Sequence, residues 1–177
     1  MSYLIIGASL NPESRSQILA EQAQLLLQNQ GKSAQWLDLR KLDLPFCAGR
    51  STYDHPSLPP LNEMVAEAEG IIVATPIYNY DVNAALKNFL ELTGQSWQEK
   101  TVGFLCAAGG KSSYMSVMSF ANNLMLDFRC LIVPRFVYAT REAFAEGKIV
   151  DETIETRLAE LVHDLVRITE ALNGQQK

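Results

Sequence analysis

Three short stretches of the chain combine small residues, hydroxyl groups and aromatic rings, which are the types that can surround a phosphate or a flat ligand. The first reads GASLNPESRS over residues 7–16 and carries hydroxyls at Ser9, Ser14 and Ser16. It follows an apolar run and leads into a helical pattern, and a helix start offers unpaired N–H groups and the positive end of the helix dipole. The stretch therefore favours a phosphate cradle. An N-capped helix with ordinary turn serines explains the same residues equally well.

The other two stretches offer a ring surface and open backbone. In TPIYNYD, Pro76 fixes the backbone just after an apolar run, Tyr78 could pack on a planar ligand, and Asn79 can both donate and accept a hydrogen bond. In AAGGKSS, Gly109 and Gly110 leave backbone N–H groups free to approach a ligand. Structural turns remain an equal alternative for both stretches.

Two common phosphate motifs are absent. The fingerprint GxGxxG needs glycines that Gly7-Ala8-Ser9 does not supply. The P-loop pattern GxxxxGK[ST] needs glycine where Leu105 stands, five residues before Gly110-Lys111-Ser112. Neither motif therefore assigns a phosphate ligand to these stretches.

Apolar runs that alternate with helical patterns indicate how these stretches are held. Short strands are expected at Leu4–Ile6, Ala34–Leu39, Ile71–Ala74, Thr101–Ala107 and, interrupted at Pro134, Cys130–Val133 with Phe136–Tyr138. Amphipathic helices are expected at Ser16–Gln30, Leu61–Ala68, from an Asp81 N-cap through Leu90, at Tyr114–Phe128 and at Glu152–Leu172, with a long loop at Asp43–Pro60. Strands and helices in this order predict an α/β fold with helices on both faces of a parallel sheet.

Five such strands fit a flavodoxin-like, three-layer sandwich with strand order 2-1-3-4-5. The pattern predicts one domain over residues 1–177. In open sheets of this kind a ligand lies beyond the carboxyl ends of the strands, at the switch point between strands 1 and 3. That rule brings the three stretches to the same edge of the sheet.

Composition narrows the class of protein. The net charge is −5, which disfavours nucleic-acid binding. The sequence contains no apolar run of about 18 residues, so no membrane-spanning helix is expected. No secretory leader pattern is visible at the N-terminus, so we expect a cytoplasmic protein. The three cysteines are far apart and there are only two histidines, so no metal site is expected.

Together the segments GASLNPESRS, TPIYNYDVNAALKNFLE and AAGGKSS resemble the NAD(P)H-dependent FMN reductase family, which includes quinone and azo reductases. The resemblance extends from Leu4 to about Ala139, and the pattern PxYN…LKN is its most specific part. Two departures stand out. Asn11 occupies the position of the family's phosphate-loop arginine, and Asn83-Ala84 replaces its usual Pro-Gly before the LKN helix.

The resemblance implies an FMN-dependent oxidoreductase that takes a hydride from NADPH or NADH and passes electrons to a flavin, a quinone or a similar small acceptor. It implies no catalytic side chain, and a homodimer or homotetramer. Tyr114 is a candidate contact for the nicotinamide or for a partner subunit. Cys47 and His55 lie in the long loop, where they could reach the active site but are more simply explained as exposed loop side chains. A non-catalytic electron carrier and a flavin-free phosphate-ligand-binding protein stay open as alternatives. The FMN contacts that the resemblance implies are Ser9, Asn11, Ser14, Arg15, Ser16, Pro76, Ile77, Tyr78, Asn79, Gly109 and Gly110.

Overall fold

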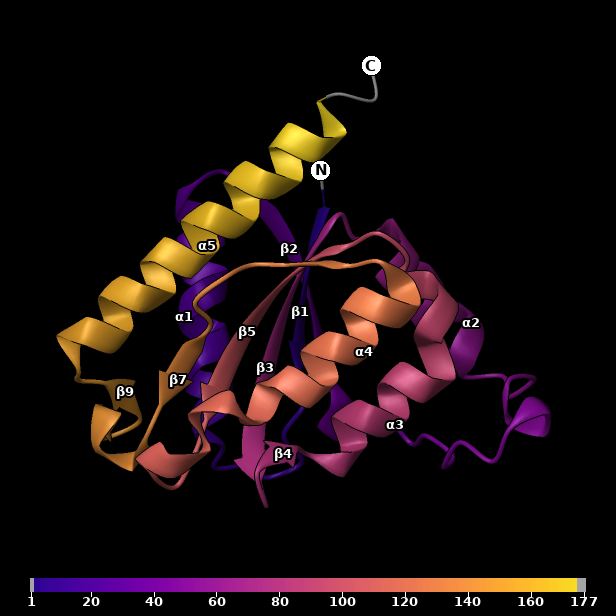
Figure 1. Cartoon of the computed structure of the whole chain (residues 1–177), viewed down its shortest axis with the longest axis horizontal. Coiled ribbons are helices and arrows are strands. Elements are labelled where there is room, and N and C mark those ends of the chain that lie inside the picture. Colours follow the sequence, from indigo (N-terminus) through magenta and orange to yellow (C-terminus); the bar gives the residue numbers. More distant parts are fainter. Residues whose placement is uncertain (1, 175–177) are drawn as a thin grey trace.

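The computed structural model describes residues 2–174 and is built around one twisted parallel sheet (Figure 1). Its strand order is β2-β1-β3-β5-β6. In spatial terms this is the predicted arrangement. The numbers read 2-1-3-5-6 rather than 2-1-3-4-5 because the structure adds a two-residue strand, β4, which pairs antiparallel with β3. The predicted fifth strand is divided at Pro134, and both of its parts, β6 and β7, pair with β5.

The elements are as follows. The strands are β1 (Ser2–Gly7), β2 (Ser33–Asp38), β3 (Gly70–Tyr78), β4 (Asp81–Val82), β5 (Thr101–Ala107), β6 (Leu131–Ile132), β7 (Val137–Ala139), β8 (Phe144–Ala145) and β9 (Lys148–Ile149). The α-helices are α1 (Arg15–Asn29), α2 (Leu58–Glu67), α3 (Ala84–Thr93), α4 (Met118–Phe128) and α5 (Glu152–Asn173). Five 3-10 turns are also present in residues 2–174, at Leu39–Lys41, Arg50–Thr52, Gly94–Trp97 (η3), Lys111–Val117 (η4) and Arg141–Ala143.

The core lies on both faces of the central strands. Every residue of β5 is buried, and so is every residue of β3 except Tyr78, as expected for apolar strands covered on both sides. Helices α1 and α5 contact each other and cover one face, whereas α2, α3 and α4 lie over the other (Figure 1). The edge strand β2 alternates between exposed and partly buried residues over most of its length. This layering leaves the ends of the strands as the place where loops can form a site.

Two local expectations need correction, and one hairpin was not expected. The long loop ends before Leu58, because Pro59 and Pro60 lie in the first turn of α2, where a missing N–H breaks no helical bond. Asp81 is not the N-cap of α3. It belongs to β4, and Asn83 is the N-cap. The hairpin of β8 and β9 has no counterpart among the expected elements, since its two strands have only two residues each.

Candidate functional site

The carboxyl ends of β1, β3 and β5 lie side by side, and the three chemically suggestive turns leave the sheet there. Gly7 is in register with Ala74, and Pro76 with Ala107. The pairing continues past the strand ends, because the Ala8 N–H donates to the Ala74 carbonyl at 2.9 Å. The three predicted turns therefore lie together at the carboxyl edge of the sheet, as the predicted topology requires.

The first turn contains three buried hydroxyl groups at the start of α1. The Ser14 and Ser16 hydroxyls are 2.8 Å apart, and the Ser9 hydroxyl accepts the Asn11 N–H at 3.2 Å. Ser14 is the N-cap of α1, yet its side chain does not cap the helix, and the first turn of α1 has no acidic residue. A pair of hydroxyls that bond each other keeps one further proton to donate. The N-terminus of α1 thus has donors and no negative charge of its own, which fits an anion.

Asn11 and Arg15, the other two predicted contacts in this turn, are exposed. The Asn11 carboxamide accepts the Glu13 N–H at 3.0 Å and so shapes the turn itself. A cation reaches the turn from the 3-10 turn after β2 instead, because the Arg40 guanidinium lies 3.5 Å from the Pro12 carbonyl. Sequence reasoning missed Arg40, which follows a different strand and shares no motif with the first turn.

The second turn is a tight hairpin. Pro76 and Ile77 are buried within β3, whereas Tyr78 and Asn79 are exposed at its end. Asn79 and Tyr80 have φ values of 51° and 66°, and two turn residues with positive φ are typical of a two-residue hairpin. The chain therefore turns back into β4 and enters α3 two residues later than expected. The predicted contacts stay at the edge, with the Tyr78 ring accessible to a flat ligand.

The third turn is an open shelf of backbone. A side-chain carbon added to Gly109 or Gly110 would meet no atom within 4 Å. The Tyr138 hydroxyl donates to the Gly110 carbonyl at 2.6 Å and fixes that peptide. Tyr114 stacks on Phe136, with ring centroids 4.8 Å apart, so part of its surface is already covered. The glycine backbone is left as the accessible surface of this turn.

The comparisons with known proteins identify the family. The sequence model of the NADPH-dependent FMN reductases matches residues 1–145. The chain belongs to this family. A NAD(P)H-dependent FAD/FMN reductase of Geobacillus thermodenitrificans is 30% identical over 76% of this chain and 74% of its own length. An NADPH:quinone oxidoreductase of Arabidopsis thaliana is 29% identical over 68% of this chain and 65% of its own length.

A solved structure, the apo form of the NADH:FMN oxidoreductase EMOB, shares the fold with a TM-score of 0.79 at 21% identity. The likeness covers 94% of this chain and 89% of that one. Family and fold confirm the predicted flavodoxin-like reductase, which uses FMN with NADPH or NADH as the electron donor. They favour this enzyme over the electron carrier and over the flavin-free alternative.

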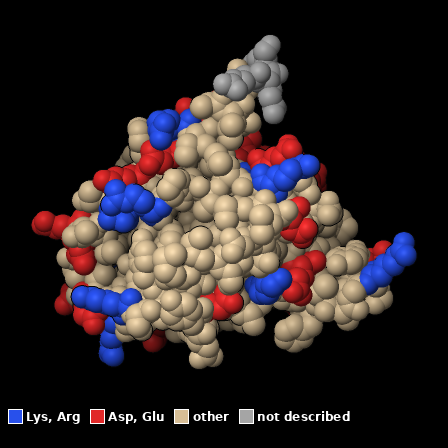
Figure 2. Space-filling view, in the orientation of Figure 1, with Lys and Arg blue, Asp and Glu red and all other residues tan. Residues whose placement is uncertain are grey.

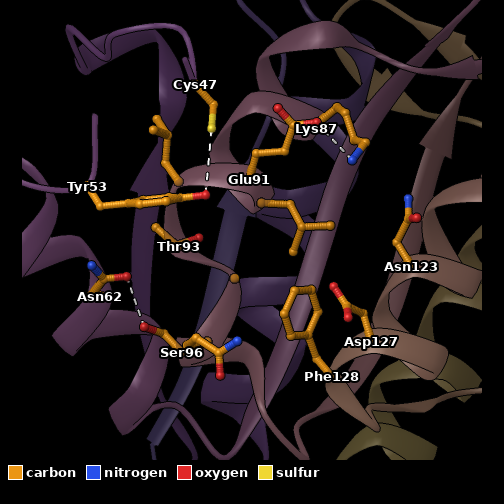
Figure 3. Close-up of a pocket in the computed structure, with 14 residues that line it drawn as sticks. Cys47, Tyr53, Asn62, Lys87, Glu91, Thr93, Ser96, Asn123, Asp127 and Phe128 are labelled. Atoms are coloured by element: carbon orange, nitrogen blue, oxygen red, sulfur yellow. Dashed lines mark hydrogen bonds and ion pairs between the residues drawn. The ribbon is translucent and has the colours of Figure 1, made fainter. Parts of the chain in front are cut away.

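Away from the three turns, the reductase has a groove between α3 and α4. One hollow of about 620 Å³ is lined by Cys47 and Tyr53 from the long loop and by Asn123 and Phe128 from α4 (Figure 3). None of the predicted FMN contacts lines it. The Cys47 thiol and the Tyr53 hydroxyl face each other across 3.9 Å. Cys47 thus lines a different hollow from Tyr78 and Asn79.

The surroundings of His55, Cys106 and Cys130 are typical of structural residues rather than of reactive ones. His55 hydrogen-bonds Ser57 at 2.7 Å, at the start of α2. Burial raises the pKa of the Cys106 thiol, and it raises that of Cys130 to about 11. Within residues 2–174 no group of three or more His, Cys, Asp and Glu side chains could hold a metal ion. No helix in the described part of the reductase is long and apolar enough to cross a membrane.

The pair of Asp38 and Arg40 supports the first turn from β2. Asp38 is buried beside Gly7, its register partner, and its carboxylate accepts from the Arg40 guanidinium at 2.6 Å. This side-chain hydrogen bond holds the pKa of the Asp38 carboxyl below its usual range. Because the folded-state pKa is lowered, the stabilising contribution is complete above the unfolded value of about 3.9 and is lost as pH falls through the folded value.

We expect Asp38→Asn to lower the free energy of unfolding by about 1 to 2 kcal/mol at pH 7, because a charge-assisted bond is lost. The difference from wild type should shrink below about pH 4, and urea unfolding at several pH values measures it. Asp164→Asn is the control, since Asp164 pairs with Arg167 on the exposed side of α5 and should change stability by less than about 0.5 kcal/mol. A gap between Asp38→Asn and wild type that does not vary with pH would contradict this account.

Proposed function

We propose that FMN binds across the three turns, with its phosphate at the first turn, its ring along the second and the pyrimidine edge over the third. The observation that carries this proposal is the continuous edge formed by a buried hydroxyl pair at the start of α1, an exposed tyrosine and an open glycine shelf. The donor set fits the cofactor. Hydroxyls and helix N–H groups suit a phosphate, and the open backbone suits a flat heterocycle.

Each part of the edge has a distinct task in the mechanism. Bound FMN would supply the redox chemistry of the reaction, namely hydride transfer from NAD(P)H and electron transfer to the acceptor. Ser14, Ser16 and the first N–H groups of α1 would hold the phosphate. The Gly109 and Gly110 N–H groups would favour negative charge on the ring edge. No side chain is needed to move a proton in the hydride step, so we name no catalytic residue.

We further propose that the physiological acceptor is a quinone or a free flavin. The named activities of the relatives support this, since one is an NADPH:quinone oxidoreductase and another an FAD/FMN reductase. The exposed Tyr78 ring and the open space beside Gly109 and Gly110 also support a planar acceptor. We also propose a cytoplasmic location, which the free thiols of Cys47, Cys106 and Cys130 support.

The test is binding followed by turnover. Purified protein should be yellow or should take up added FMN, and NADPH or NADH should bleach the bound flavin in a stopped-flow experiment. Steady-state oxidation of NAD(P)H with benzoquinone and with free FMN then ranks the acceptors. The proposal fails if the protein stays colourless with excess FMN, or if it binds FMN that neither nicotinamide reduces.

A second copy of the chain is the partner that we propose for the groove between α3 and α4. Figure 2 shows a broad uncharged area over α4, with charged side chains at its margins. Leu126 on α4 is 83% exposed, and Met115 and Leu131, just before and after the helix, are also exposed. A second hollow of about 570 Å³, lined by Tyr78 and Asn79, shares Lys87 and Asn123 with the first. A subunit seated on α4 would therefore approach the flavin site.

We expect the protein to have a solution mass of two or four times 19.7 kDa, by light scattering after size-exclusion chromatography. Leu126→Glu should convert it to a monomer, because a charge would then be buried in the interface. Leu25→Glu is the matched control, since Leu25 is exposed on α1, on the opposite face of the sheet. A monomeric wild type, or a Leu126→Glu protein of unchanged mass, would refute the proposed interface.

A further inference from the structure

One buried carboxamide joins two of the three turns. Asn83 is only 5% exposed and lies between the end of β4 and the start of α3. Its Nδ2 atom donates to the Ala8 carbonyl at 2.7 Å. Its Oδ1 atom lies 3.3 Å from the Thr75 hydroxyl, which shares its single proton between Asn83 and the Pro76 carbonyl at 3.1 Å. Ala8 and Thr75 are fully buried, so these partners have no access to water. The side chain therefore links the turn after β1 to β3.

The side chain of Asn83 is not used for its own helix. Asn83 is the N-cap of α3, but its carboxamide caps no N–H group, and only its backbone carbonyl receives the Leu86 and Lys87 N–H groups. This position is one of the two where the chain departs from the family's usual Pro-Gly. Proline has no side-chain donor or acceptor, so it could not make either of the bonds that Asn83 makes.

The bond to Ala8 bears directly on the predicted phosphate contacts. A trans peptide directs its carbonyl and its N–H to opposite sides. By holding the Ala8 carbonyl, Asn83 therefore turns the Ser9 N–H away from itself. Ser9 continues the network, because its hydroxyl accepts the Asn11 N–H. The orientation of this turn consequently depends on a residue that is 75 positions away in the sequence.

We propose that Asn83 is a positioning residue that holds the first turn against β3, and that it thereby sets the preference of the site for FMN over unphosphorylated riboflavin. This inference rests on the proposed FMN site. It makes the phosphate part of the cofactor, rather than the ring, sensitive to Asn83. A proline at this position could make neither bond, and the arginine that the family carries in its phosphate loop is replaced here by Asn11.

Two substitutions test the link. Asn83→Ala removes both hydrogen bonds. Asn83→Pro also removes them and introduces the residue that the family usually has at this position. Proline should fit there, because the φ of Asn83 is −69° and the preceding residue, Val82, already has the extended backbone that a following proline requires. Asn88→Ala is the matched control, because Asn88 lies five residues further along, in the first half of α3. Its carboxamide also makes two hydrogen bonds to backbone, accepting from the Cys47 N–H and donating to the Pro45 carbonyl. That control loosens the long loop and leaves the first turn in place.

We expect both Asn83 variants to raise the dissociation constant for FMN about ten-fold and that for riboflavin less than about two-fold, as measured by flavin fluorescence quenching. Asn88→Ala should change neither constant by more than about two-fold. A general loss of stability would weaken both ligands alike, so equal changes for FMN and riboflavin would overturn the proposal. Unchanged FMN affinity in both Asn83 variants would overturn it as well.

Hydrogen exchange of the flavin-free protein provides a second readout that does not depend on FMN. Peptides covering residues 8–14 should exchange about ten-fold faster in Asn83→Ala than in wild type, whereas Asn88→Ala should accelerate only the segment around Pro45 and Cys47. If residues 8–14 exchange at the wild-type rate in both Asn83 variants, the link does not hold the turn. If wild type binds no FMN, the proposed function fails, and the exchange result still decides the link.

Discussion

Ser14→Asp should weaken FMN binding at least about 100-fold while leaving the fold intact. Ser14 is the N-cap of α1, and aspartate is among the best N-cap residues, so the helix should be as stable as before. Its carboxylate would occupy the place proposed for the phosphate. Two like charges a few ångströms apart repel by several kcal/mol at the effective dielectric constant of a protein surface. Titration with FMN and with riboflavin, which lacks the phosphate, measures the effect.

The control for this prediction is Ser57→Asp. Ser57 is the N-cap of α2 and likewise makes no capping bond through its side chain, so the change adds the same charge at another helix start. It should leave FMN affinity unchanged within about two-fold. If Ser14→Asp still binds FMN as tightly as wild type, or if riboflavin binding falls equally, the phosphate does not lie at the start of α1.

Trp97→Ala should lower the free energy of unfolding by about 3 to 5 kcal/mol, which is the usual loss for deleting a buried tryptophan. Trp97 lies in η3 and is fully buried. Its indole N–H donates to the Thr93 hydroxyl at 3.0 Å, and its ring meets Phe89 edge to face at 6.4 Å between centroids. The residue therefore anchors the turn that joins α3 to β5, and equilibrium urea unfolding measures its loss.

Two comparison variants make the result specific. Trp97→Phe keeps most of the ring volume and should cost less, about 1 to 2 kcal/mol. Trp36→Ala removes the other tryptophan, which is only partly buried on the edge strand β2, and should also cost less than Trp97→Ala. A Trp97→Ala protein as stable as either would show that η3 contributes little to the core.

The sequence predicted the parts of the fold that depend on local pattern. The apolar runs of β1, β3 and β5 are recognisable because strands buried on both faces need no polar alternation, and the sheet rule then placed their turns together. The hairpin at Asn79 and Tyr80 was missed, since it depends on two non-glycine residues with positive φ, which no simple pattern indicates. The wrong N-cap, Asp81, followed from that omission.

Two residues that support the first turn, Asn83 and Arg40, could not be found from local sequence patterns. Asn83 was noted only as a departure from the family, and its bond to Ala8 appears only once β1 and β3 are adjacent. Arg40, which follows β2, contacts the Pro12 carbonyl and is held by the Asp38 carboxylate. Nothing in the sequence around these two charged residues indicates that they lie beside the first turn. Contacts between distant segments are set by topology, so the eleven contacts implied by family resemblance did not include these residues.

The non-local pairing of the three turns also connects the cofactor to the lifetime of the protein. Gly7 pairs with Ala74, and Pro76 with Ala107, so an unfolded chain lacks the assembled edge proposed to bind FMN. Any ligand that binds only the native state raises stability by mass action, by about 2.7 kcal/mol when its free concentration is 100 times the dissociation constant. Resistance to heat and to proteolysis should therefore rise and fall with the supply of flavin in the cell.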